Sequence, residues 1–134
     1  GEDEPAVEWQ VGWFVAFPCP PSCRRSVDVG QIVEVVRNDE GDELVVHWFT
    51  PKAKRLPRLR SRYGKGGWSQ QYRVKTKSCG KKVRVPDKGT DSVEAACATF
   101  PALLAGTQTL PQFVWEAVEE SVAAPGEQPE EEEV

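Results

Sequence analysis

Residues that build catalytic and metal sites are scarce in this sequence. Its 134 residues include one histidine, four cysteines and no methionine. Cys19 and Cys23 form a single close pair, whereas structural zinc sites usually combine two such pairs. No nucleophile with a neighbouring base and no phosphate-binding glycine loop is evident. We therefore expect a protein that is not an enzyme, with reduced thiols and neither a metal nor a cofactor.

Long hydrophobic runs are also missing. No stretch reaches the roughly eighteen apolar residues that a membrane helix needs, and no charged-then-apolar leader opens the chain. We expect neither a membrane span nor a signal peptide and, without an initiating methionine, a domain of a longer protein. Short apolar segments alternate with eleven glycines and eleven prolines, which favours a β-rich chain with many turns.

The third shortage is local, because residues 52–84 contain thirteen basic side chains and no acidic one. Residues 1–49 carry three basic and ten acidic groups, and residues 85–134 carry one basic and eleven acidic groups. The net charge of −4 therefore hides a basic segment between two acidic flanks. Such segregation indicates partners better than the overall charge does.

Residues 29–49 predict the central structural element. Two runs rich in β-branched and aromatic residues flank a polar cluster, which is the pattern of a β-hairpin. In its second half, Leu44, Val46 and Trp48 share one face, as the period of a strand requires. Residues 11–17 predict a strand that precedes this hairpin.

A second, more exposed hairpin is predicted further along the chain. Its strands are expected at 70–77 and 81–85, joined by a turn at 78–80. The weak alternation places Tyr72 and Val74 inward.

The C-terminal third predicts helices. Asp91 and Glu94 resemble the ends of a capping box, which predicts a short helix to about residue 98. Pro111 suits the start of a second helix. The apolar stripe of that helix, expected to pack on the sheet, is Val114, Trp115, Val118 and Val122.

These elements predict a mainly β fold: a small SH3-like five-stranded barrel or a curled antiparallel sheet, with a C-terminal helix. The domain is expected to span residues 9–123 and to include a basic loop at 50–69. Residues 1–8 are expected to form an acidic extension, and residues 124–134 an acidic, disordered tail.

Four segments carry a resemblance to a known family: VGWFVAF, GQIVEVV, ELVVHWF and LPQFVWEAVEE. In this order, with a Tyr-containing loop before the last, they resemble chromo- or Tudor-like SH3-fold domains of animal retroelement and transposon proteins. The resemblance implies a nuclear, chromatin-associated protein and a reader of peptides. The chain departs from the pattern at Ser26-Val27-Asp28, where the family often has an aromatic residue, and in its more basic loop.

The basic segment predicts a surface that binds a polyanion, because phosphate contacts supply most non-specific affinity for nucleic acids. The alternative is a solvated face balanced by the acidic termini. Lys81 also lies in this segment. The candidate nucleic-acid-binding residues are Lys52, Lys54, Arg55, Arg58, Arg60, Arg62, Lys65, Arg73, Lys75, Lys77, Lys82 and Arg84.

Five aromatic residues are candidates for an aromatic cage or for stacking on bases. They are Trp13, Trp48, Tyr63, Trp68 and Tyr72. A cage would bind a methylated ammonium group by cation–π attraction, and stacking would hold unpaired bases. Trp13 and Trp48 are favoured as core residues. Tyr63 and Trp68 lie among glycines and charged residues, so we expect them to be exposed.

The sequence therefore predicts a non-catalytic module that contacts nucleic acid or chromatin through its basic segment. The alternative is a peptide reader with an aromatic cage. Either protein would be intracellular and nuclear, bind no membrane and take no small-molecule substrate. His47 is expected to be a structural or rim residue, and residues 130–133 are expected to compete for the basic loop as an internal polyanion.

Overall fold

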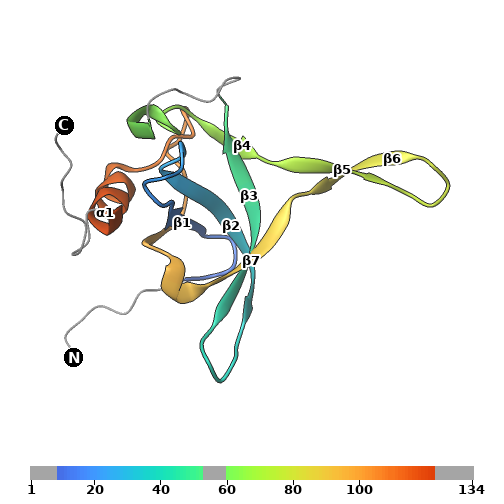
Figure 1. Ribbon diagram of the computed structural model, residues 1–134, viewed down its shortest axis with the longest axis horizontal. Coiled ribbons are helices and arrows are strands. Elements are labelled where there is room, and N and C mark those ends of the chain that lie inside the picture. The colour runs from blue at the N-terminus through green and yellow to red at the C-terminus, as the bar shows by residue number, and fades with distance from the viewer. Residues whose placement is uncertain (1–8, 53–59, 123–134) are drawn as a thin grey trace.

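The computed structural model describes residues 9–52 and 60–122 of the chain. The described residues form an antiparallel sheet of six strands, from which a two-stranded sheet projects (Figure 1). The elements, in chain order, are β1 (Phe14–Pro18), β2 (Val27–Val36), β3 (Glu43–Pro51), η1 (Arg60–Arg62), β4 (Trp68–Gln70), β5 (Tyr72–Thr76), β6 (Lys82–Pro86), β7 (Lys88–Ser92), η2 (Val93–Ala95), β8 (Ala98–Phe100) and α1 (Gln112–Val122).

The central hairpin predicted from residues 29–49 is formed by β2 and β3, which pair over most of their length. A register shift at Val33 places a bulge in β2, and such a bulge bends a strand. β1 pairs with the other edge of β2, and β8 pairs with β1. The main sheet therefore runs in the order β4, β3, β2, β1, β8.

The outer edge of β3 is shared by two strands. β4 pairs with its last residues, and β7 pairs with residues Glu43 to His47. Trp48 lies between the two paired stretches of β3. Beside it the chain leaves the sheet after β4, forms β5 and β6, and returns to the sheet as β7. The edge strand is thus interrupted, and residues 72–86 are looped out from it.

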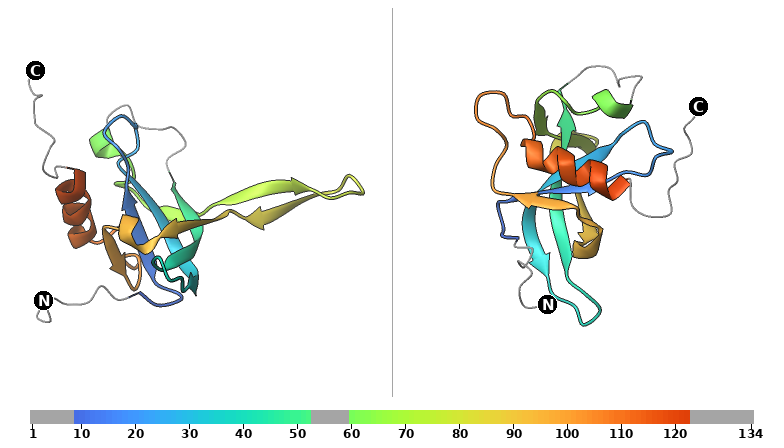
Figure 2. Two further views of the ribbon diagram at one scale, coloured as in Figure 1. Left: turned by 60° about the horizontal axis from the view of Figure 1, so that its bottom comes forward. Right: turned by 90° about the vertical axis from the view of Figure 1, so that its left-hand side faces the viewer.

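Apolar side chains fill both faces of the main sheet. One cluster contains Phe14 and Ala16 of β1 together with Val114 and Val118 of α1, which covers that face (Figure 2). The other contains the alternate β1 residues Val15 and Phe17, with Ile32, Leu44 and Val46. The predicted packing of the C-terminal helix on the sheet is confirmed for Val114, Trp115 and Val118, and the side chain of Val122 lies outside what the structure describes. The strand predicted at 11–17 is found, but it begins at Phe14, and Val11 is exposed.

The mainly β, antiparallel character is confirmed, but the predicted barrel is not found. Within the described residues β4 and β8 are the ends of an open sheet, and the strands outnumber the five expected. The short helix predicted at 91–98 is wrong. Ser92 caps only the 3-10 turn η2 by accepting from the Glu94 N–H, and the chain then extends into β8. The acidic extension at 1–8 and the tail at 124–134 lie outside the described residues.

Candidate nucleic-acid interface

Residues 72–86, called the arm below, form a two-stranded ribbon that extends away from the main sheet (Figures 1 and 2). Every residue of β5 is exposed, and so are the residues of the turn. Tyr72 and Val74 are 38% and 63% exposed, so the prediction that they point inward is wrong. Tyr72, at the base of the ribbon, meets the buried His47 ring edge to face over 5.3 Å, whereas Val74 is exposed further out along the ribbon. The second, more exposed hairpin is itself confirmed.

The turn of the arm follows from its sequence. The Gly80 N–H donates to the Lys77 carbonyl and the Lys77 N–H donates to the Lys81 carbonyl, which closes a three-residue loop. Gly80 has a φ of +91°, a conformation that glycine adopts without steric cost. A three-residue loop with glycine at the left-handed position is a common β-hairpin connection. The ribbon is therefore locally specified up to its tip.

The register of the arm sorts its cations onto two faces. Residues directly opposite each other in an antiparallel pair project to the same side. Arg73 pairs with Val85 and Lys75 with Val83, so these cations share one face. Alternation along the strands adds Lys77 and Lys81 to that face. The opposite face carries Lys82 and Arg84, which pair with Thr76 and Val74.

The arm contains no acidic residue that could neutralise these charges. The ion pairs within the described part of the chain are Arg25–Asp28 and Arg37–Asp42, both on the body. Within the arm, the Arg84 guanidinium lies 4.6 Å from the centre of the Tyr72 ring. The remaining arm cations project into solvent. The arm is therefore a concentrated positive surface that a polyanion can reach from several sides.

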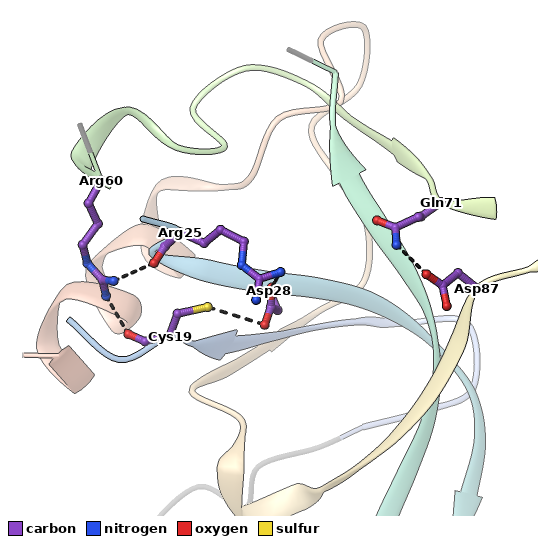
Figure 3. Close-up of polar contacts among 6 residues, drawn as sticks. All are labelled: Cys19, Arg25, Asp28, Arg60, Gln71 and Asp87. Carbon is purple, nitrogen blue, oxygen red and sulfur yellow. Dashed lines mark hydrogen bonds and ion pairs between the residues drawn. The ribbon is translucent and has the colours of Figure 1, made fainter. Parts of the chain in front are cut away.

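Hydrogen bonds join the base of the arm to β3. The Gln71 N–H donates to the Trp48 carbonyl over 2.9 Å, and the Trp48 N–H donates to the Asp87 carbonyl over 2.8 Å. The Gln71 amide also donates to the Asp87 carboxylate (Figure 3). The buried His47 ring donates from Nε2 to the Gln71 carbonyl over 3.0 Å, which assigns the proton to that nitrogen. His47 thus has the structural role that its sequence position predicts, and the ribbon leaves the body at a fixed point.

The other predicted cations that the structure describes, Lys52, Arg60, Arg62 and Lys65, lie outside the arm. Lys52 and Arg62 are exposed, and the Lys65 ammonium lies 3.9 Å from the centre of the Trp115 ring. Lys54, Arg55 and Arg58 fall outside the described residues. The predicted basic residues therefore do not form one surface in the described part of the chain. Most of those that lie close together are in the arm.

Arg60 has a role inside the fold that the sequence did not indicate. Its guanidinium donates to the carbonyls of Cys19, Pro20, Cys23 and Arg25. Figure 3 shows the contacts with Cys19 and Arg25. A fork of N–H donors can satisfy several carbonyls of one loop, because its geometry is fixed and its charge is permanent. Arg60 therefore organises the loop between β1 and β2, and its charge is already compensated by these dipoles.

The expected exposure of Tyr63 and Trp68 is wrong. Trp68 is fully buried and Tyr63 is 5% exposed, and their rings meet edge to face 5.9 Å apart in the core beneath α1. The Trp68 indole N–H donates to the Gly64 carbonyl over 2.8 Å. A Cβ on Gly64 would overlap the Trp68 ring, and its φ is +73°. Gly64 therefore leaves room for a tryptophan of the core and is not the sign of an exposed loop.

The five predicted aromatic residues do not form one cage. Trp13 and Trp48 pack partly buried against the cluster on the sheet face away from α1, whereas Tyr72 lies on the arm. Two of the five, Trp48 and Tyr63, line a small pocket of about 150 Å³. The other side chains of that pocket are Arg25, Asp28, Phe49 and Gln71. Stacking by Tyr63 and Trp68 on bases is not available in this arrangement, because both rings are in the core.

The thiols of the described residues are unpaired and two are shielded. Burial, followed by the Asp28 carboxylate 3.4 Å away, raises the pKa of the Cys19 thiol to about 12. Burial raises the pKa of the Cys97 thiol to about 11. Among residues 9–52 and 60–122, no three His, Cys, Asp or Glu side chains are grouped so that they could hold a metal ion.

Within the same residues, no helix has the length and apolar character required to cross a bilayer. Comparison of the chain with protein-family models, with curated proteins and with solved structures gave no match.

Proposed function

We propose that this chain is a non-catalytic module that binds nucleic acid, with the arm as its principal contact surface. The observation that carries the proposal is the projecting ribbon with six basic residues, no acidic residue and no ion pair among its described side chains. Polyanion binding requires a dense positive surface from which counterions on the nucleic acid are released. A solvated face would not need a ribbon held away from the body.

The body of the protein is the scaffold in this proposal. It is an SH3-like sheet of the chromo or Tudor kind, and the chain is a nuclear protein related to those of mobile elements. The bent, antiparallel β2–β3 hairpin and the helix that covers one face support the SH3-like part of this assignment. Because the core lies outside residues 72–86, the arm can serve binding without contributing to the core.

A titration with labelled DNA and RNA oligonucleotides at several salt concentrations tests the proposal. Six contacts between arm cations and phosphates give a slope of about −5 in a plot of log K against log salt. A protein with all six arm cations changed to glutamine should bind far more weakly and with a much flatter slope. Equal slopes for the two proteins would contradict the proposal.

A second candidate function is a peptide reader, favoured by the 150 Å³ pocket that Trp48, Phe49, Tyr63 and Asp28 line. Aromatic faces beside a carboxylate attract a methylated ammonium group. The Asp28 carboxylate is 3.2 Å from the Arg25 guanidinium, which competes for it. Titration with methyl-lysine peptides, monitored by the Trp48 indole resonance, tests this function. An unchanged indole signal at saturating peptide would eliminate it.

A further inference from the structure

The arrangement of the arm cations indicates which form of nucleic acid the arm binds. A ribbon lying flat on a surface uses one face, and the cations of the other face remain in water. Here Arg73 and Lys75 project from one face and Lys82 and Arg84 from the other. Cations on both faces are used together only when phosphates lie on both sides of the ribbon. A groove between two phosphate backbones meets that condition.

The thickness of the ribbon indicates which groove of a duplex it can enter. One sheet layer with its side chains is about 10 Å thick, since stacked sheets pack at about that spacing. The major groove of B-form DNA is about 12 Å wide and the minor groove about 6 Å wide. The ribbon therefore fits the major groove and is too thick for the minor groove. Five-residue strands span about 17 Å, which exceeds the major-groove depth of about 8.5 Å.

The same features exclude other nucleic acids as the preferred target. The major groove of an RNA duplex is deep and narrow, so a ribbon of this thickness does not enter it. Single strands are held chiefly by aromatic rings that stack on bases. Tyr72 is the aromatic residue of the arm, and its ring is in contact with Arg84. Tyr63 and Trp68 are buried in the body.

We propose that the arm inserts into the major groove of B-form duplex DNA, with each face directed at one of the two phosphate backbones. This inference rests on the proposed nucleic-acid function and narrows it to one substrate class. The fixed base of the arm supports it. The backbones of Gln71 and Asp87 are both hydrogen-bonded to Trp48, so the base of the ribbon is held on the body. Little conformational entropy is therefore lost at the base of the ribbon on binding.

The test measures the affinity of the full chain for four probes by fluorescence anisotropy. They are a DNA duplex of about 20 base pairs, the same duplex with glucosylated 5-hydroxymethylcytosine, an RNA duplex and a DNA single strand of the same sequence. Glucose fills the major groove and leaves the phosphates in place. We expect the unmodified DNA duplex to bind most tightly and glucosylation to weaken binding about tenfold or more.

Paired variants test the use of both faces. The doubly substituted R73Q/K75Q and K82Q/R84Q proteins each lose two positive charges from one face of the arm. Both should bind the DNA duplex more weakly, and each should flatten the salt slope by about 2. The control R24Q/R37Q removes the same charge from exposed positions on the body and should leave the slope unchanged. Circular dichroism spectra of the three variants test whether each of them is folded.

The outcomes separate the two proposals. If the glucosylated duplex, the RNA duplex or the single strand binds as tightly as unmodified DNA, or if only one face contributes, insertion into the major groove is wrong. An arm-dependent salt slope in the same experiment would still support the proposed function. If no probe binds with a salt dependence that the arm variants alter, both proposals fail.

Discussion

Removing the arm separates its role in binding from its role in folding. The cut is placed at the base, where the Asp87 N–H donates to the Gln71 carbonyl over 3.0 Å and the two residues lie opposite each other. Replacing residues 72–86 with Gly-Gly would join β4 to β7 and leave both paired with β3. None of the buried core residues lies within the excised segment. We therefore expect a folded protein whose melting temperature stays within about 5 °C of the original value.

The expected change in binding follows from the charges removed. The arm carries six of the seventeen basic residues. Six phosphate contacts give a log–log slope of about −5, so the association constant falls about 10³-fold between about 50 and 200 mM salt. The excised protein should lose most of this salt dependence together with most of its affinity at low salt.

The assay is the anisotropy titration of a DNA duplex at the two salt concentrations. The matched control shortens the other hairpin, replacing residues 38–41 of the acidic tip with Asn-Gly. That change leaves the arm intact and should preserve affinity and slope. An excised protein that is folded and keeps the original slope would refute the role assigned to the arm.

Three further predictions concern the body. Trp68→Ala should lower the free energy of unfolding by about 3–5 kcal/mol, because it opens a cavity beneath α1, while the folded fraction still binds DNA; chemical denaturation followed by anisotropy measures both. Arg60→Gln should lower that free energy by roughly 2–3 kcal/mol in the same denaturation experiment, since loop carbonyls lose their donor; an unchanged midpoint would contradict the role inferred from its four contacts. The raised pKa values of Cys19 and Cys97 mean that the neutral thiols stabilise the fold fully below pH 9, and that this contribution is lost as the pH rises toward 11 to 12. Between about pH 7 and about pH 10.5, the free energy of unfolding should therefore fall less for Cys19→Ala than for the original chain. An equal fall in the two proteins would contradict the contribution assigned to the Cys19 thiol.

Local patterns predicted the elements that depend on neighbours in the sequence. The β2–β3 hairpin, the exposed second hairpin and the stripe on α1 follow from alternation, turn residues and helical spacing. Each of these signals is complete within about twenty residues. For that reason the position of the arm in the chain could be predicted.

Features that depend on distant partners could not be predicted in this way. The sequence of β7 (KGTDS) has little strand propensity and is extended because it completes the edge of β3. Trp68 occurs in a glycine-rich, basic context that is typical of exposed loops, yet its ring packs against Gly64 and the core. Arg60 is one of several similar cations in sequence, and only the folded loop between β1 and β2 brings four carbonyls to it.

The most direct test of the central claim is an amide NMR spectrum of the full chain, recorded as a DNA duplex is added at low salt. If the arm is the contact surface, the largest shifts fall on residues 72–86, and the amides of α1 stay in place. Large shifts on α1 and on residues 60–65, with the arm unchanged, would contradict the account and move the interface to the other end of the molecule.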